Sequence, residues 1–165
     1  MTTTSTRIDA STSLRPETPD DYEFLAELYA STREEELRPV DWSPEQKRLF
    51  LRMQFDAQFA HYRLHYREAE FWVIERGGER IGRLYLHYRP EDLRIVDIAL
   101  VAAARGQQLG GRIVRRLLDD AAAAGRSVSI HVERNNPALR LYQRFGFRQI
   151  DENGIYLLME WRAAS

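Results

Sequence analysis

The stretch LRIVDIALVAAARGQQLGGRIVRRLLDDAAAAG, residues 93–125, decides how this chain folds. Residues 93–101 are rich in Ile, Leu and Val, which favours a strand. From 108 to 124, apolar side chains recur on one face of a helix, and Gly125 just past its end suits a left-handed terminator. A strand, a glycine-rich turn and an amphipathic helix therefore follow one another directly.

The turn before this helix reads Arg105-Gly106-Gln107-Gln108-Leu109-Gly110-Gly111. A glycine-rich start lets backbone N–H groups approach an anion at a helix amino terminus, where the helix dipole also favours negative charge. The turn lacks the G-K-S/T of a nucleotide P-loop and the G-x-G-x-x-G of a dinucleotide fold. Glycine content alone fits a structural turn without a ligand equally well.

The remaining elements follow outward from this stretch. Upstream, we expect a strand from Leu14, helices over 18–37 and 43–67, and two strands within 71–88 that turn at Gly77-Gly78. Downstream, we expect a strand over 127–132, a short helix over 137–145, and closing strands over 147–150 and 154–161. This order predicts a mixed α/β layer fold with a largely antiparallel sheet.

The second of these helices carries two apolar stripes, one through Leu49 and Met53 and one through Leu51 and Phe55. Apolar residues on more than one face favour a deeply packed core helix over a cofactor-binding aromatic stripe. A homodimer surface is the other alternative.

Length, charge and composition narrow the function classes. The chain has 165 residues, which is the size of one domain, and we expect a flexible polar tail over 1–12 and a single domain over 13–165. The net charge of -1 disfavours general nucleic-acid binding, and the absence of Cys removes disulfides, thiol nucleophiles and cysteine-ligated zinc. Without a spanning segment or a secretory signal, a cytoplasmic protein with no membrane partner is expected.

A second motif lies one strand and one helix downstream, where residues 135–147 read NNPALRLYQRFGF. Together the two segments resemble the GNAT superfamily of acyl-CoA-dependent N-acyltransferases. The family's diphosphate motif, R/Q-x-x-G-x-G/A, here falls on Arg105, Gln108 and Gly110. Its later motif, N-x-x-A-x-x-x-Y followed by G-F, falls on Asn135, Ala138, Tyr142, Gly146 and Phe147.

The resemblance covers nearly the whole ordered chain and implies a single-domain GNAT-like fold. That fold has a mixed, mostly antiparallel sheet of about seven strands and four helices. Its central strands, here 94–101 and 127–132, splay apart and leave backbone groups free. One departure stands out: Gln108 replaces the first glycine of the family's loop.

The resemblance also implies acetyl-CoA as the acyl donor, with no metal. The expected CoA contacts are Ala99, Leu100, Val101, Arg105, Gly106, Gln107, Gln108, Leu109, Gly110, Gly111, Asn135 and Tyr142. An N–H of residues 99–101 can polarise the thioester carbonyl. The amine attacks directly, so no protein nucleophile is needed.

Tyr142 is expected to be the general acid that protonates the departing thiolate. Helix periodicity alone favours ordinary core packing for this tyrosine, and the motif supplies the catalytic interpretation. For the general base, Asp97 and Glu133 are rival candidates, because each leaves an apolar strand near the expected splay. A water relay is a third alternative.

Other polar groups carry weaker signals. His61 and His65 lie one helical turn apart but lack the glutamate of a zinc motif, so we expect them at the surface. His131 is nearer the expected cleft than His87. The acidic run at Glu34–Glu36 can attract a cationic amine, but a solvated helix end is the preferred interpretation.

The sequence thus predicts an N-acetyltransferase that transfers the acetyl group of acetyl-CoA to an amine, either a small molecule or a peptide. The alternative is a non-catalytic acyl-CoA-binding sensor with the same fold. The identity of the acceptor does not follow from the sequence.

Overall fold

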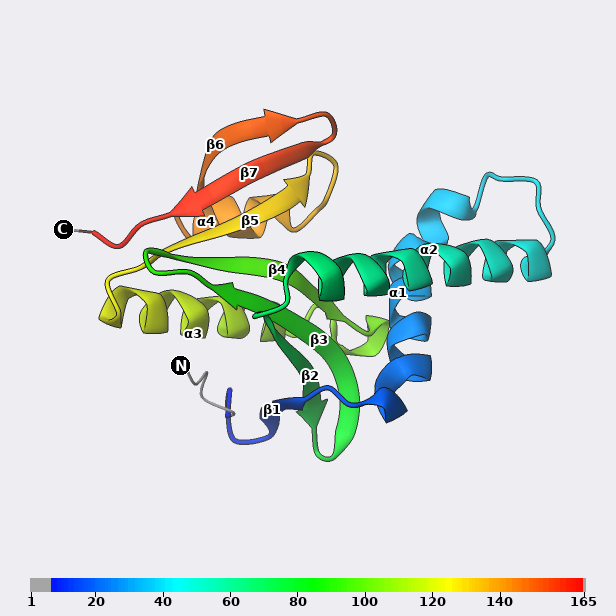
Figure 1. Cartoon of the computed structure of the whole chain (residues 1–165), viewed down its shortest axis with the longest axis horizontal. Coiled ribbons are helices and arrows are strands. Elements are labelled where there is room, and N and C mark those ends of the chain that lie inside the picture. Colours follow the sequence, from blue (N-terminus) through cyan, green and yellow to red (C-terminus); the bar gives the residue numbers. More distant parts are fainter. Residues whose placement is uncertain (1–6, 165) are drawn as a thin grey trace.

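The computed structural model describes residues 7–164, which form a seven-stranded sheet with helices on both faces (Figure 1). The elements in chain order are β1 (Thr12–Pro16), α1 (Tyr22–Leu37), α2 (Pro44–His65), β2 (Glu70–Arg76), β3 (Glu79–Tyr88), β4 (Asp92–Leu100), α3 (Leu109–Ala123), β5 (Ser127–Glu133), α4 (Leu139–Arg144), β6 (Arg148–Asn153) and β7 (Tyr156–Trp161). The strands are ordered β1-β2-β3-β4-β5-β7-β6. All neighbours are antiparallel except β4 and β5.

The predicted fold class is confirmed, and the local signals act as expected at several positions. The side chain of Ser43 accepts a hydrogen bond from the Gln46 N–H at the start of α2. Gly77 and Gly78 both have positive φ in the β2–β3 hairpin. Gly125 has a φ of 71° just past α3, where the left-handed conformation ends the helix.

The structure describes part of the expected amino-terminal tail. Residues 1–6 of the expected tail lie outside the described part of the chain. Within residues 7–12, the N–H groups of Ile8 and Asp9 donate to the carbonyl of Thr12 at 2.9 and 3.2 Å, and Thr12 already belongs to β1. The first helix also starts differently, because a single 3-10 turn over Pro19–Asp21 precedes α1.

The main core lies between the sheet and the helices α3 and α4, whereas a second cluster joins α1 to α2. Leu84 of β3 points into the main core. The next residue, Tyr85, faces the other way and packs edge-on against Tyr62 of α2, with ring centroids 5.8 Å apart. The alternation of β3 therefore places α3 and α2 on opposite faces of the sheet (Figure 1).

Helix α2 corrects the expectation of a deeply packed core helix. Leu51 and Phe55 are buried against α1. Leu49 and Met53, from the other stripe, are 65% and 64% exposed. The reason is that α2 lies at the outside of the molecule, where only one of its faces meets α1 and the sheet (Figure 1).

The splay of the central strands is visible in the sheet register. β4 and β5 pair over a short segment that ends at Ile95 opposite Ile130. Beyond that point β4 continues along β3, while β5 continues along β7. A gap therefore opens between β4 and β5.

A β-bulge at Val96, where the gap opens, changes the direction of the side chain of Asp97. Tyr85 pairs with Asp97 and Leu86 pairs with Ile95, so Val96 has no partner in β3. One extra residue reverses the alternation of a strand. Asp97 therefore leaves the core-facing side, to which Ile95 belongs, and faces α2 with Tyr85.

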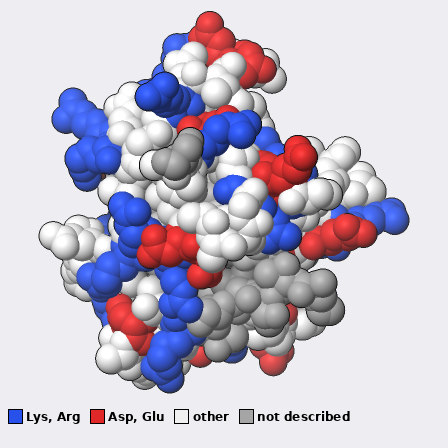
Figure 2. Space-filling view, turned by 90° about the vertical axis from the view of Figure 1, so that its left-hand side faces the viewer, with Lys and Arg blue, Asp and Glu red and all other residues white. Residues whose placement is uncertain are grey.

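The surface carries charges of both signs. On the face in Figure 2, acidic side chains lie between the basic ones, in keeping with the net charge of -1. Over the described residues, none of the helices combines the length and apolar character that crossing a bilayer requires.

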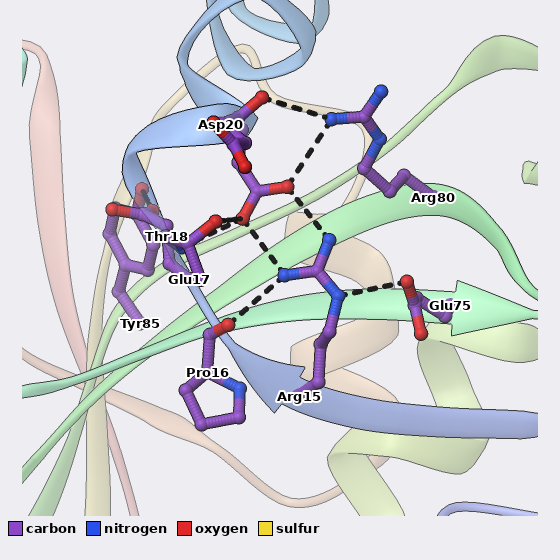
Figure 3. A network of polar contacts seen from close by, with 9 residues as sticks. Arg15, Pro16, Glu17, Thr18, Asp20, Glu75, Arg80 and Tyr85 are labelled. Atoms are coloured by element: carbon purple, nitrogen blue, oxygen red, sulfur yellow. Dashed lines mark hydrogen bonds and ion pairs between the residues drawn. The ribbon is translucent and has the colours of Figure 1, made fainter.

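The start of α1 is fixed to the sheet by a buried carboxylate. Asp21 accepts a bidentate pair of bonds from Arg15, at 2.7 and 2.9 Å, and a bond from the Thr18 N–H at 2.8 Å. Arg15 also reaches Glu75 of β2, and Arg80 of β3 approaches Asp21 at 3.3 Å (Figure 3). This network connects β1, β2 and β3 to the helix.

Candidate active site

Two cavities border the gap between β4 and β5. The α2-side cavity has a volume of about 740 Å³ and is partly walled by α2, and the α3-side cavity has a volume of about 690 Å³ and reaches the start of α3. The residues that line both are Arg33, Gln58, Asp97, Ile98, Glu133, Asn136 and Tyr142. Because the cavities share these residues, molecules bound in each of them can meet at the gap.

The α3-side cavity collects many of the residues singled out by sequence. Those that line it are Asp97, Ala99, Leu100, Arg105, Gly110, Glu133, Asn135 and Tyr142. Those that do not line it are Val101, Gly106, Gln107, Gln108, Leu109 and Gly111. The side chain of Leu109 is buried in the main core instead, and 106–108 form the exposed turn beside the helix start.

The turn before α3 contains two residues in the left-handed conformation. Gly106 and Gln108 have positive φ values of 74° and 62°, so Gln108 adopts the conformation that a glycine would favour. The side chain of Gln108 is exposed. The side chain of Gln107 bonds Arg76 at 2.8 Å and the carbonyl of Ala103 at 3.0 Å.

The free edge of β4 presents a different set of backbone groups from the expected one. The N–H of Val101 donates to the Ile81 carbonyl of β3 at 2.8 Å, so the backbone of Val101 faces the sheet. The N–H and C=O groups of successive residues in a strand point to opposite edges. Since those of Val101 point to β3, those of Leu100 and Ile98 point to the gap. The Leu100 carbonyl accepts a bond from Arg105 Nε at 2.9 Å. Ile98 was not singled out by sequence.

Tyr142 of α4 lies where the two cavities meet. Its side chain is buried and packs edge-on against Phe147. Burial and, second, the negative charge of Asp97 raise the pKa of Tyr142 well above its usual range. The hydroxyl therefore keeps its proton at neutral pH.

Asp97 reaches the gap because of the bulge at Val96. Its carboxylate forms an ion pair with the buried Arg83 and accepts a bond from the Tyr62 hydroxyl at 3.3 Å. Burial, followed by the charge of Asp97, raises the pKa of Tyr62. Burial, the largest single influence, lowers the pKa of Arg83, but Asp97 together with Tyr85 and Tyr62 outweighs it, so the net shift is upward.

Glu133, the rival carboxylate, projects from the end of β5. The guanidinium of Arg33, in α1, lies 3.2 Å from the carboxylate of Glu133 and 2.8 Å from that of Glu36. Two carboxylates therefore share this guanidinium. Burial and, second, the charge of Glu133 raise the pKa of the nearby Tyr156. The structure therefore brings Asp97, Glu133 and Tyr142 to one place.

The α2-side cavity contains residues that the sequence did not reveal as site residues. Arg33, Tyr62, Tyr66 and Arg94 line it together with His131. These side chains come from α1, the carboxyl-terminal half of α2, β4 and β5, so only the tertiary fold brings them together.

The remaining polar groups follow simpler patterns. His61 and His65 are exposed, with ring centroids 4.3 Å apart. Across residues 7–164, no group of three His, Asp or Glu side chains is placed to hold a metal ion. In the acidic run, the exposed Glu35 pairs with Arg38 at 3.0 Å, as expected of a solvated helix end.

The sequence matches the Acetyltransferase (GNAT) family over residues 23–147. None of the curated proteins matches the sequence. The match covers most of the chain, from the first turns of α1 to the G-F pair after α4.

Solved structures show the same fold at low sequence identity. The PaiA N-acetyltransferase of Thermoplasma acidophilum, in complex with coenzyme A, is 16% identical with a TM-score of 0.70, and the alignment covers 93% of this chain and 99% of that one. A GNAT acetyltransferase of Elizabethkingia anophelis with acetyl-CoA bound is 20% identical with a TM-score of 0.60, covering 94% and 100%. An acetyltransferase of Salmonella typhimurium is 16% identical with a TM-score of 0.65, covering 96% and 99%. The family match over residues 23–147 shows that this chain belongs to the GNAT family of acetyltransferases.

Proposed function

We propose that the protein transfers the acetyl group of acetyl-CoA to the nitrogen of an amine by direct attack in a ternary complex. The observation that carries this proposal is the meeting of two cavities at one gap, lined by Asp97, Glu133 and Tyr142. One cavity can admit the thioester and the other the amine, so that the reacting atoms approach each other between β4 and β5.

The donor is assigned to the α3-side cavity. The diphosphate would lie at the turn 105–111, where backbone N–H groups and the dipole of α3 favour an anion. Gly110 adds no side chain there, and its nearest neighbour, Leu100 Cδ1, is 4.0 Å from where a Cβ would be. The pantetheine arm would follow the free edge of β4 at Ile98 and Leu100, as an added strand does.

Proton transfers at the gap complete the chemistry. The neutral amine nitrogen attacks the thioester carbonyl carbon, and a C–N bond forms as the carbonyl electrons move to oxygen. Asp97 accepts the proton that the nitrogen loses, directly or through one water. When the C–S bond breaks, the carbonyl re-forms and Tyr142 donates its hydroxyl proton to the thiolate. Tyr142 then recovers the proton held by Asp97, directly or through water, so the amine has lost one proton, the thiol of CoA has gained one, and both side chains are restored.

Asp97 is the preferred base over Glu133 for two reasons. It directly precedes the free edge of β4 at which the acyl group would lie, and its charge acts on Tyr142. Glu133 shares Arg33 with Glu36 at the end of β5, one strand away from that edge. Glu133 then helps to hold Arg33 in the wall of the acceptor cavity.

The acceptor is an amine of a small molecule or a peptide. The Salmonella typhimurium neighbour modifies the N-terminal serine of ribosomal protein L7/L12, which supports including peptides among the candidates. We place the reaction in the cytoplasm, where acetyl-CoA is available as donor. Sedimentation of the purified protein decides whether it forms a homodimer.

The decisive experiment measures CoA release from acetyl-CoA with polyamines, amino acids, aminoglycosides and peptides as acceptors. We expect steady turnover with at least one class and a loss of about 10²-fold in kcat for Tyr142→Phe, with CoA binding unchanged. CoA binding without turnover on any amine would favour the sensor alternative. Full activity of Tyr142→Phe would mean that the hydroxyl of Tyr142 is not the general acid and that this side chain only packs in the core.

The donor site has a separate test by calorimetry. Gly110→Glu adds bulk and negative charge at the start of α3 and should abolish CoA binding while the far-UV circular dichroism stays unchanged. Ala124→Glu adds the same group at the exposed far end of the helix and should bind CoA normally. Equal affinity in both variants would exclude the turn as the diphosphate site.

A further inference from the structure

Arg94 brings a guanidinium into the α2-side cavity without a carboxylate partner among the described residues. Its Nε donates to the Ser129 hydroxyl at 2.8 Å, and its Nη1 lies 3.2 Å from His131 Nδ1. Burial and, second, the charge of Arg89 lower the pKa of Arg94. By contrast, the pKa of Arg15 is raised by its bond to Asp21, which is the usual result of a paired guanidinium.

The carboxylate next to Arg94 is already occupied. Asp92 forms an ion pair with Arg89 and accepts hydrogen bonds from the hydroxyls of Ser127 and Ser129, at 3.1 and 2.8 Å. Asp92 therefore pairs with Arg89 rather than with Arg94, and the charge of Arg94 at the wall of the cavity has no ion-pair partner among the described residues.

The groups that contact Arg94 are neutral hydrogen-bond acceptors rather than acids: the Ser129 hydroxyl, His131 Nδ1 and the Tyr66 hydroxyl. Burial, followed by the charges of Arg94 and Arg89, lowers the pKa of His131, so its ring is neutral at pH 7. A neutral ring whose Nδ1 faces the donating Arg94 carries its proton on Nε2. His87 of β3 pairs with Arg94 in the sheet register. The ring of Tyr66 packs edge-on against the ring of His87, with centroids 5.5 Å apart.

Each of the two carboxylates that line this cavity contacts a guanidinium: Asp97 is paired with Arg83, and Glu133 contacts Arg33, which it shares with Glu36. Among the described residues that line the cavity, Arg94 is the arginine without a carboxylate contact. This distribution fits an acceptor that carries negative charge and opposes a polyamine.

Building on the proposed function, we propose that Arg94 and His131 form an anion subsite and that the acceptor is an amine bearing a carboxylate or a phosphate. Because of the bulge at Val96, Arg94 and Asp97 lie opposite His87 and Tyr85 of β3, two residues apart, so about 7 Å separates them along the sheet. That separation is about the distance between the first and third residues of an extended tripeptide. The anion would bind at Arg94 while the amine reaches Asp97 and the gap.

Matched pairs of acceptors test the proposal. Trialanine is compared with its carboxyl-terminal amide, and glucosamine 6-phosphate with glucosamine, each with acetyl-CoA. We expect one anionic member to exceed its neutral partner about tenfold in kcat/KM, through KM, as the loss of one charge-assisted contact implies. The pair that responds tells whether a peptide carboxylate or a phosphate is the natural anion.

Variants of Arg94 separate binding from a structural role. Arg94→Gln should abolish the preference by raising KM for the anionic member, with kcat and the neutral member unchanged. Arg94→Lys, which keeps the charge, should restore most of the preference. Arg148→Gln removes an exposed arginine on β6 and should have no effect. Equal losses on both members of a pair, or a preference for spermidine, would overturn the proposal.

A binding measurement makes the anion subsite independent of turnover. Titration with inorganic phosphate or succinate should shift the NMR signal of the His131 ring in the wild type but not in Arg94→Gln, with His131→Gln assigning the signal. If no amine is acetylated and this shift persists, the proposed function fails and the anion subsite stands. If neither anion shifts the signal, the anion subsite fails.

Discussion

Two carboxylates, the buried Asp21 and the half-buried Asp97, each form an ion pair with an arginine but differ in what surrounds them. Asp21 is 1% exposed and receives bonds from Arg15 and from the Thr18 N–H, in a network that also contains Arg80 (Figure 3). The side chain of Asp97 is 18% exposed, pairs with one arginine and borders both cavities.

The difference separates a carboxylate that donors enclose from the one that we propose as the base. The bond from Arg15, which outweighs burial, lowers the pKa of Asp21 well below its usual range, and donors already surround both of its oxygens. Such a carboxylate has no room for a substrate. Asp97 borders open space at the gap, so it can exchange a proton with a bound amine.

Asp97→Asn should have the largest effect and should act on catalysis. Removing the base should lower kcat/KM about 10³-fold, or about 4 kcal/mol of transition-state stabilisation. The acidic limb of the pH–rate profile should move upward or disappear. Thermal unfolding is measured in parallel to confirm that the variant is folded, since Arg83 loses its charged partner.

Glu133→Gln is the matched control for this prediction. It neutralises the other carboxylate of the gap and should alter KM more than kcat, through the release of Arg33. If Glu133→Gln moves the pH limb and Asp97→Asn does not, the two roles are exchanged. If neither variant moves it, a water chain or an already neutral amine is the better account.

Asp21→Asn should have the next largest effect and should act on stability. The amide cannot match the bidentate charged contact with Arg15, so unfolding by urea should show a loss of about 3 kcal/mol. At temperatures where the variant is folded, kcat per folded molecule should equal that of the wild type. A loss of kcat per folded molecule would mean that Asp21 also acts in catalysis, and the distinction between the two carboxylates would be wrong.

The same carboxylate predicts how stability depends on pH. Because the folded pKa of Asp21 is lowered, its contribution is fully present above the unfolded value of about 3.9 and is lost as the pH falls below it. The wild type should therefore lose stability below about pH 4, while Asp21→Asn should show a shallower decline. Urea midpoints from pH 7 to 2.5 make this comparison.

Gly82→Ala should have an intermediate effect, because it disturbs β4 without changing either carboxylate. A Cβ at Gly82 would lie 2.4 Å from the Ala99 carbonyl, so β4 must shift beyond Asp97. We expect a loss of about 2 kcal/mol in stability and weaker CoA binding by calorimetry. In Gly110→Ala the new Cβ meets nothing closer than 4.0 Å, so unfolding should show no such loss.

The sequence predicted much of the fold because its elements have strong local signals. The amphipathic face of α3, the cap at Ser43 and the glycines of the β2–β3 hairpin act within a few residues of the chain. The motif residue Tyr142 also lies at the gap as a candidate site residue. Local patterns sufficed in these cases.

Other features depend on tertiary structure and left no local pattern. Simple alternation places Asp97 on the core face with Ile95, and only the unpaired Val96 turns it toward α2. The exposure of Met53 reflects what α2 packs against, which its periodicity does not specify. Arg94 became informative only when the partners of Asp92 were known.

Gln108→Gly should have the smallest effect and concerns the backbone rather than a carboxylate. Gln108 has a φ of 62°, a conformation that costs a residue with a Cβ about 1 kcal/mol. Glycine removes that strain but gives the unfolded chain more freedom, which offsets part of the gain. Urea unfolding should therefore show a change between zero and about 1 kcal/mol of added stability.

CoA affinity is the sharper measurement for the same variant. If the exposed side chain of Gln108 leaves the N–H groups of the turn in place, Gln108→Gly should bind CoA as tightly as the wild type or more tightly. Gln108→Ala keeps the Cβ in the left-handed conformation and should gain no stability. A loss of CoA affinity shared by both variants would mean that the Gln108 amide contacts the cofactor, and that this chain has replaced the family's glycine with a binding group.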